Sequence, residues 1–249
     1  MNTPRSIKRL GASLLIGGQA VAATLRGRID RGELFEQMLD AGPGSVLIVL
    51  IISVAAGSVF NIQVAAELTR QGAGSTVGGI LAIGLAREIA PLLTSCLLAG
   101  KVATAYAAQL GTMKVTEQID AITMLRTDPV EYLVVPRIIA GVVMLPLLIF
   151  VADIIGVFGG FLVSVYKLGF NPSIYLQNTW DFLELLDVVS GLVKASVFGF
   201  LVALMGCYHG YYSGGGAQGV GKATTNAVVS ASILILCFNY ILTEAFFGL

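Results

Sequence analysis

The stretch LGTMKVTEQIDAITMLRTDPVEYLVVPR, residues 110–137, is a charged segment between two long apolar runs. Apolar side chains recur in it at helical spacing, and Asp128-Pro129 ends the pattern. The pattern predicts a short helix outside the hydrocarbon layer, with acidic residues on its exposed face. An ordinary solvated loop helix and a docking element for another subunit fit this spacing equally well. The polar residues at its start are Lys114, Glu117, Gln118 and Asp120.

The chain around this segment has the composition of a membrane protein. Of its 249 residues 56% are hydrophobic and only 12% are charged, and the mean hydropathy is +0.85. A soluble domain has about 25% charged residues. The net charge is zero, which gives no reason to expect nucleic-acid binding. The three cysteines lie in apolar runs and the chain has one histidine, so we expect neither a disulfide nor a metal site.

Five apolar runs are long enough to cross a bilayer, which takes about 20 residues in a helix. The second and third of them flank residues 110–137. The sequence therefore predicts an all-α integral membrane protein with five transmembrane helices and a connecting helix between the second and the third. The five runs are residues 46–68, 77–108, 138–165, 188–212 and 227–249.

The region before the first run is predicted to be separate from the five-helix domain. Gly42-Pro43-Gly44 interrupts the chain there, which divides it into residues 1–43 and residues 44–249. Between residues 5 and 40, apolar residues recur at roughly helical spacing beside six basic ones. This pattern indicates an amphipathic interfacial helix in the headgroup region, and a pair of short soluble helices is the alternative.

The distribution of Lys and Arg predicts the orientation, because positive residues stay on the cytoplasmic side. With the N-terminus inside, ten of the 15 basic residues fall in cytoplasmic segments and only Arg70 and Lys167 fall outside. We therefore expect the N-terminus and residues 110–137 in the cytoplasm and the C-terminus on the outer side. The outer segment 166–187 is acidic, with Asp181, Glu184 and Asp187, and offers Tyr175, Trp180 and Phe182 to the membrane interface.

Arg87 and Glu88 lie well inside the second apolar run. Ionisable residues at that depth cost about 2.5–3.5 kcal/mol each on insertion scales, so they usually face a cavity or a partner. Adjacent residues do not face each other on a helix, so the two need separate partners. Pro91 lacks an amide donor and crowds the carbonyl of Arg87, which predicts a bent helix with a free carbonyl. The alternative is a position near the outer interface, from which both side chains reach water.

Lys194 is a further buried charge, near the start of the fourth apolar run. An unpaired ammonium group there would lose its proton or find a carboxylate. Glu88, Asp153 and Glu67 are the candidate partners, and Glu88 is our first choice. Asn239 in the last run fits such a network, and it fits a simple hydrogen bond between helices equally well.

The segment GAQGVGK, residues 216–222, imitates a phosphate-binding loop. It has the G-x4-G-K spacing, but Ala223 stands where the metal-binding Ser or Thr belongs, and the segment follows an apolar run rather than a strand. Any ATP and Mg²⁺ are therefore expected in another subunit, and no cofactor is expected in this chain. His209 lies in a glycine-rich segment that we interpret as a turn, and no catalytic triad is evident, so we expect no enzymatic activity.

Small residues recur at four-residue spacing in the second and third runs. Such spacing lets helix backbones approach closely, either within a bundle or across a dimer. The residues are Ala99, Ala103, Ala107 and Gly111 in the second run and Gly156 and Gly160 in the third.

The run AREIAPLLTSCLLAGKVATAYAAQLGTMKVTEQIDAITMLRTDPVEYLVVPR resembles the signature of the MlaE/YrbE permeases, the membrane subunits of Mce-associated ABC lipid transporters. GVGKATTNAVV at 219–229 and NYILT at 239–243 resemble their C-terminal signature. The likeness extends from residue 44 onward, and GTMKVTEQIDA is highly specific. It implies a homodimer with an N-terminal interfacial helix and five spans. It also implies a separate cytoplasmic ATPase dimer and an Mce-domain substrate-binding protein on the outer side.

The same resemblance assigns roles to single residues. It makes residues 114–125 the coupling helix that docks on the ATPase, and it matches Lys194 to a buried lysine of the fourth helix. Asn239 stands where aspartate is frequent, so a Lys-Asp pair cannot form and Glu88 remains the partner of Lys194; Lys101 stands where arginine is common. The residues assigned to the lipid cavity are Arg87, Glu88, Lys194, Asn239, Phe60 and Gln63, with Pro91 as the helix kink.

The resemblance thus implies a permease that moves phospholipids or related lipids between membranes, powered by a separate ATPase. The expected location is a bacterial inner membrane, with a plastid inner envelope as the less expected one. The residues by themselves leave open an ion-coupled secondary transporter of a lipophilic or anionic substrate, built around Glu88 and Lys194. A purely structural membrane scaffold is a third interpretation.

Overall fold

The computed structural model describes residues 16–20, 22–23 and 30–248, and every regular element in these ranges is a helix. Five helical segments of the described chain are long and apolar enough to cross a membrane. This confirms the predicted class, an all-α integral membrane protein. The segments are Arg31–Arg70, Gly74–Val115, Val130–Tyr166, Leu185–Tyr211 and Gly216–Phe247.

The first segment consists of two helices that meet at Gly42. α2 (Arg31–Ala41) begins where the side chain of Asp30 accepts hydrogen bonds from the amides of Gly32 and Glu33. α3 (Pro43–Arg70) begins with a proline, which fits the first turn because no amide donor is needed there. Half of the interfacial helix expected between residues 5 and 40 lies outside the described residues. The polar residues of α2 itself are largely acidic, including Glu33, Glu36 and Asp40.

The second segment is a helix interrupted by two π turns. After the short turn η1 (Gly74–Thr76), it runs through α4 (Val77–Gly84), η2 (Leu85–Ile89), α5 (Ala90–Leu98), η3 (Ala99–Ala103) and α6 (Thr104–Val115). A π turn inserts one extra residue into the helix and often marks a functional site. η2 contains both Arg87 and Glu88.

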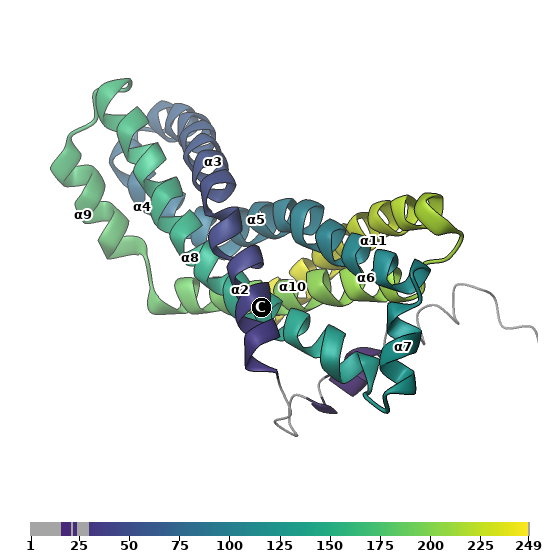
Figure 1. Ribbon diagram of the computed structural model, residues 1–249. Coiled ribbons are helices and arrows are strands. Elements are labelled where there is room, and N and C mark those ends of the chain that lie inside the picture. Colours follow the sequence, from purple (N-terminus) through teal and green to yellow (C-terminus); the bar gives the residue numbers. More distant parts are fainter. Residues whose placement is uncertain (1–15, 21, 24–29, 249) are drawn as a thin grey trace, which may run out of the picture.

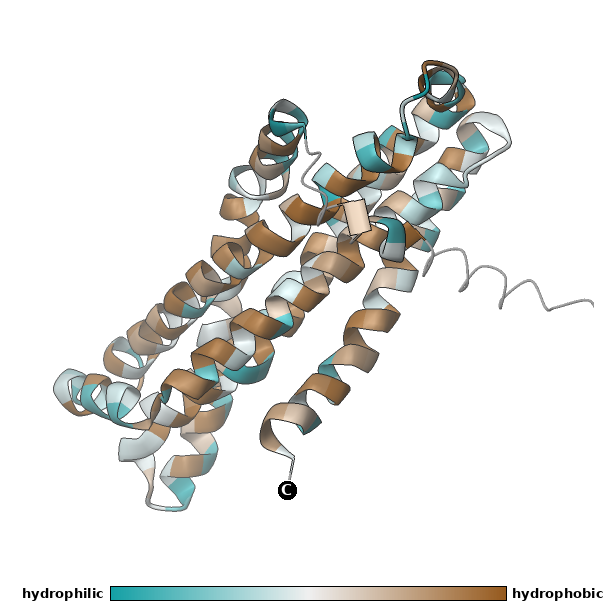
Figure 2. Cartoon of the chain, turned by 90° about the horizontal axis from the view of Figure 1, so that it is seen from below, coloured by the Kyte–Doolittle hydropathy of each residue, from teal (hydrophilic) through white to brown (hydrophobic). Residues whose placement is uncertain are grey.

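The remaining helices are arranged so that the two short connecting helices lie at opposite ends of the bundle (Figure 1). α7 (Gln118–Met124) precedes η4 (Val130–Val134) and α8 (Val135–Tyr166), and α9 (Pro172–Phe182) precedes α10 (Leu185–Tyr211) and α11 (Gly216–Phe247). α8 packs on α3 and α10, and α10 packs on α6 and α11. Apolar residues cover the middle of the bundle, and hydrophilic residues gather towards its ends (Figure 2).

The small-residue ladders pack within the chain rather than being left for a partner. A Cβ atom added to Gly57 of α3 would lie 1.9 Å from the carbonyl oxygen of Gly156 on α8. One added to Gly206 of α10 would lie 2.9 Å from Cα of Ala103 in η3. The two alternatives that the spacing left open are thus resolved in favour of close helix contacts inside the bundle.

The structure differs from the sequence prediction at the start of the last span and at His209. α11 begins at Gly216 rather than at residue 227, so the GAQGVGK segment forms the first two turns of a helix and not an open loop. His209 lies on α10, which continues to Tyr211, and its Nε2 lies 3.0 Å from Oγ of Ser230. The neighbouring glycines made this segment look like a turn, but Gly210 packs closely against Ala107 of α6.

The connecting segment that contains α9 also departs from its prediction. Tyr175 of α9 is only 2% exposed, and its hydroxyl group donates a hydrogen bond to Oδ1 of Asn61 at 3.5 Å. It therefore anchors α9 to α3 instead of resting at the interface. Trp180 is 74% exposed and remains available for that position.

Candidate functional site

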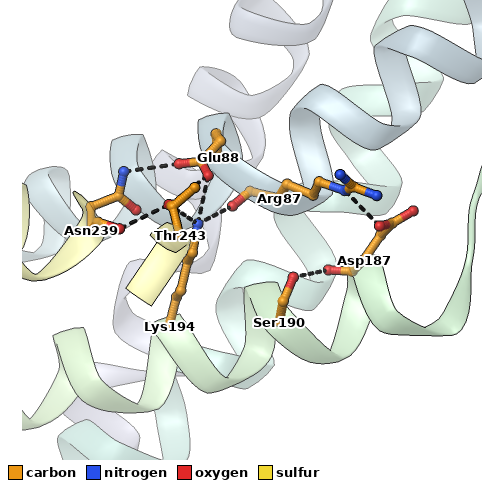
Figure 3. A network of polar contacts seen from close by, with 7 residues as sticks. All are labelled: Arg87, Glu88, Asp187, Ser190, Lys194, Asn239 and Thr243. Carbon is orange, nitrogen blue, oxygen red and sulfur yellow. Dashed lines mark hydrogen bonds and ion pairs between the residues drawn. The ribbon is translucent and has the colours of Figure 1, made fainter. Parts of the chain in front are cut away.

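The ammonium group of Lys194 is the centre of a polar network between η2, α10 and α11 (Figure 3). Its Nζ donates hydrogen bonds to the backbone carbonyl of Arg87 at 2.8 Å, to Oε1 of Glu88 at 2.6 Å and to Oγ1 of Thr243 at 2.8 Å. The side chain of Lys194 is 0% exposed, whereas that of Glu88 is 36% exposed. All three donors of the ammonium group have acceptors, and Glu88 is confirmed as its carboxylate partner.

Pro91 explains why the carbonyl of Arg87 is free. In an α-helix the amide of residue 91 would bond to the carbonyl of residue 87, but proline has no N–H. The distortion takes the form of the π turn η2, where the amide of Ala90 bonds to the carbonyl of Leu85. Lys194 supplies the donor that the backbone lacks. The free carbonyl was predicted from the sequence, and the π turn was not.

Two residues of α11, one turn apart, complete the network. Nδ2 of Asn239 donates to Oε2 of Glu88 at 2.8 Å, which confirms that Asn239 joins it. Oγ1 of Thr243 lies 2.8 Å from Oε1 of Glu88 and 2.8 Å from the backbone carbonyl of Asn239. Sequence reasoning missed Thr243, although its four-residue spacing from Asn239 places both on one helix face.

Arg87 pairs with a second acid, on the side away from Glu88 (Figure 3). Its Nε donates to Oδ1 of Asp187 at 2.6 Å, and the Asp187 side chain is 0% exposed. The other carboxylate oxygen of Asp187 accepts the amide of Glu184 at 3.0 Å, in the capping box that begins α10. The separate partners expected for Arg87 and Glu88 are confirmed, but Asp187 was taken for an ordinary residue of the acidic outer segment.

The guanidinium group of Arg87 retains free donors. Its side chain is 32% exposed, and among the described residues its side-chain hydrogen bonds use Nε alone. Its central carbon lies 4.0 Å from the centroid of the Phe247 ring, a distance at which the cation is attracted to the ring face. The two terminal nitrogens are therefore left for a ligand that accepts hydrogen bonds, such as a phosphate group.

Phe60 and Gln63 lie apart from this network. Phe60 is half-buried on α3 and packs against a second apolar cluster, around Leu81 and Leu85. Gln63 is exposed on the same helix. The structure therefore brings four of the six residues assigned to the lipid cavity into one region, and Phe60 and Gln63 lie outside it.

The segment 114–125 is a helix end followed by a separate helix, not one continuous helix. Lys114 belongs to α6, and Glu117 adopts a left-handed backbone conformation (φ 61) before α7 begins at Gln118. Nζ of Lys114 donates to Oδ1 of Asp120 at 2.8 Å across this break. Ile119 is 1% exposed and anchors α7, whereas Met124 is 85% and Leu125 is 78% exposed. The connection thus presents charged and apolar side chains to the surroundings at one end of the bundle.

Comparison with known proteins gives a consistent assignment. The family model described as Permease MlaE matches residues 34–245. A protein of Rickettsia felis named as a probable ABC transporter permease is 44% identical over 245 residues, which cover 98% of this chain and 95% of the relative. A probable ABC transporter permease of Synechocystis is 45% identical over 240 residues, covering 96% of this chain and 91% of the relative.

A plant protein is also similar. The chloroplastic protein TRIGALACTOSYLDIACYLGLYCEROL 1 of Arabidopsis thaliana is 36% identical over 233 residues, covering 94% of this chain and 67% of the relative. The family match, the near-complete coverage and the five membrane-spanning segments agree with one another. The chain belongs to the MlaE permease family and is an ABC transporter permease.

Proposed function

We propose that this permease moves phospholipids or related lipids between membranes and that a separate ATPase dimer powers it. The observation that carries the proposal is the paired set of charges, Arg87 with Asp187 and Glu88 with Lys194, on helices long and apolar enough to cross a membrane. Such charges are expensive in a bilayer and mark a substrate path. Apolar walls take the acyl chains, and the free guanidinium nitrogens of Arg87 bind an anionic headgroup.

Two further observations support a lipid substrate. The name of the Arabidopsis relative contains that of a galactosyl diacylglycerol, a lipid with two acyl chains. In this chain, the exposed apolar side chains of α3 and α11 leave wide surfaces against which acyl chains pack, among them Leu47, Ile51, Ile233 and Leu236.

The ATPase docks on α7 in this proposal. α7 lies outside the spans, between the second and third, where permeases of this class meet their motor. Met124 and Leu125 are large apolar side chains exposed at its C-terminal end, and Glu117, Gln118 and Asp120 are exposed at its start. A surface that combines exposed apolar and charged side chains is suited to a protein interface.

The complete transporter contains two copies of the chain, two ATPase subunits and an Mce-domain protein on the outer side. The two copies enclose a cavity that opens to the α9 end of the bundle. The excess of Lys and Arg in the segments predicted to be cytoplasmic supports a cytoplasmic N-terminus, and the bacterial relatives support a bacterial inner membrane.

A reconstitution experiment tests the proposal. The permease, the ABC-type ATPase and the Mce-domain protein encoded with it are assembled in vesicles, and ATP-dependent transfer of fluorescent phospholipid is measured. We expect Arg87→Gln to lower the transfer rate about tenfold, because a charge-assisted contact to the headgroup is lost. Arg70→Gln, at an exposed residue outside the network, is the matched control. Transport by the permease alone, driven by a proton gradient, would instead establish an ion-coupled transporter.

A further inference from the structure

A cavity of about 250 Å³ lies where α2 meets α3, against η3 and α6. It is separate from the network of Figure 3, and charges of opposite sign line it. Asp40 of α2 provides a carboxylate, and Lys101 of η3 provides an ammonium group. Gln109 and Tyr106 add an amide and a phenol, and the remaining lining residues are small or apolar.

The polar groups of this cavity have unused bonding capacity. Nζ of Lys101 donates to the backbone carbonyl of Gly44 and, at 2.9 Å, to Oγ of Ser45, so one of its three donors is left. Within the described ranges neither Lys101 nor Asp40 forms an ion pair, although both line the same cavity. Tyr106 is 2% exposed, and its buried hydroxyl group has no hydrogen-bond partner among the described residues. Because this hydroxyl group has almost no accessible surface, the polar groups open to a ligand in the cavity are those of Lys101, Asp40 and Gln109.

The cavity lies at the level of the lipid headgroups. α3 starts at Pro43, and its first large exposed apolar residues are Leu47 and Ile48, which are 72% and 42% exposed. The edge of the hydrocarbon layer therefore falls within the first turn of α3, next to Gly44 and its contact with Lys101. By the distribution of Lys and Arg, this is the leaflet at the cytoplasmic end of the bundle.

A separate apolar depression of only about 10 Å³ lies farther along the same two helices, towards the Lys194 network. It is formed by Ile52 and Ala56 of α3 with Ile89 and Leu93 of the second segment. Ile52 is eight residues from Gly44 and Leu93 is eight residues from Lys101, which corresponds to about 12 Å along each helix. Ile89 directly follows Glu88, so this depression lies beside the charged site and apart from the cavity.

We propose that this cavity binds the headgroup of an aminophospholipid, with its acyl chains against the exposed apolar side chains of α3 such as Leu47 and Ile51. Lys101 binds the phosphate, and Asp40 accepts hydrogen bonds from the primary ammonium group. The Gln109 carbonyl oxygen, which accepts from Nη2 of Arg137 at 3.2 Å, has a second lone pair for the same ammonium group. A choline headgroup cannot donate these bonds, and a headgroup without an amine is repelled by Asp40. The proposal rests on the proposed lipid function and deepens it, because it gives the transporter an entry site in the leaflet at the α7 end.

Lipid binding by the full-length protein tests the proposal. The purified permease is mixed with phosphatidylethanolamine, phosphatidylcholine or phosphatidylglycerol, and retained lipid is measured by native mass spectrometry. We expect phosphatidylethanolamine to bind about tenfold more tightly than phosphatidylglycerol and Asp40→Asn to remove this preference. We expect Lys101→Gln to weaken the binding of all three lipids. Lys101→Arg keeps the charge and should bind them as the wild type does.

Two controls test whether the preference for phosphatidylethanolamine arises in this cavity. Glu36→Gln removes another exposed carboxylate of α2, one that does not line this cavity, and leaves lipid binding unchanged. A photo-crosslinking amino acid in place of Ala105, an exposed residue of the cavity wall, captures phosphatidylethanolamine in the wild-type background and not with Asp40→Asn. An equal loss of preference with Glu36→Gln would mean that the general charge of α2 selects the lipid, and the proposed site would be wrong.

The outcome separates this inference from the proposed function. If Arg87→Gln abolishes lipid binding while Asp40→Asn and Lys101→Gln bind as the wild type does, the lipid function stands and the entry site is refuted. If the wild-type protein binds none of the three lipids and the reconstituted complex transfers none, both fail.

Discussion

Lys194 on α10 donates a hydrogen bond at 2.8 Å to the backbone carbonyl of Arg87, which belongs to the second membrane-spanning segment. Pro91 leaves this carbonyl without its helical donor, so a side chain of one helix repairs the backbone of another. The same ammonium group neutralises Glu88. A distortion that would be costly in lipid is thereby converted into a fixed polar site, with Arg87 and Glu88 held in different directions.

Loss of the ammonium group should destabilise the protein. In Lys194→Met, the carboxylate of Glu88 and the carbonyl of Arg87 lose their shared donor. A fully buried ion pair costs about 3–5 kcal/mol when one partner is removed. Because Glu88 is 36% exposed, we expect a smaller loss, about 2 kcal/mol. Thermal unfolding in detergent measures it, and the double variant Lys194→Met with Glu88→Gln should recover part of the loss. An unchanged unfolding midpoint in the single variant would contradict this.

The role of Pro91 can be isolated with a double-mutant cycle. Pro91→Ala returns an amide donor to the carbonyl of Arg87, so this carbonyl no longer depends on Lys194. We expect Lys194→Met to be less destabilising in the Pro91→Ala background, by about 1 kcal/mol, the typical net value of one hydrogen bond. Unfolding free energies of the four proteins give the coupling. Strict additivity would show that proline and lysine act independently.

The contact between α3 and α8 requires glycine. Gly57→Ala places a methyl group 1.9 Å from the carbonyl oxygen of Gly156, so the two helices must separate. Overpacking of this kind costs about 1–3 kcal/mol. Gly100→Ala is the matched control, because nothing lies within 4 Å of the added Cβ, and it should be neutral or slightly stabilising. The unfolding midpoints of both variants should be compared, and equal values would speak against close packing at Gly57.

Exchange of the ion pair between α6 and α7 separates a docking role from a structural one. Asp120→Lys removes the pair with Lys114 and reverses a charge of the proposed motor contact. We expect it to lower co-purification of the ATPase about tenfold, while stability changes by less than about 1 kcal/mol, because surface pairs contribute little. The exchanged pair, Lys114→Asp with Asp120→Lys, restores the ion pair but not the original positions of the two charges on the surface that faces the ATPase. Recovery of ATPase binding by the exchanged pair would assign Asp120 a structural role alone.

Much of the site was readable from the sequence because charges are scarce in an apolar chain. Arg87, Glu88 and Lys194 stood out by their depth, and the missing donor of Pro91 predicted the free carbonyl. Thr243 and Asp187 did not stand out, since threonine is common in membrane helices and Asp187 follows two other acids in its segment. Phe60 and Gln63, also assigned to the cavity, lie apart from the Lys194 network on α3, which packs closely against α8 at Gly57 and Gly156.

Composition and periodicity by themselves determined that this protein crosses a membrane five times and has a short charged helix between the second and third spans. Each of these properties can be read from one segment alone, because a helix of about 20 consecutive apolar residues is more stable in the hydrocarbon of a bilayer than in water. Tertiary structure alone decided which charges pair, where the second span widens into π turns, and that Asp40 and Lys101 line one cavity. These relationships join residues far apart in the chain, and they depend on helix rotation and depth, which no single segment encodes.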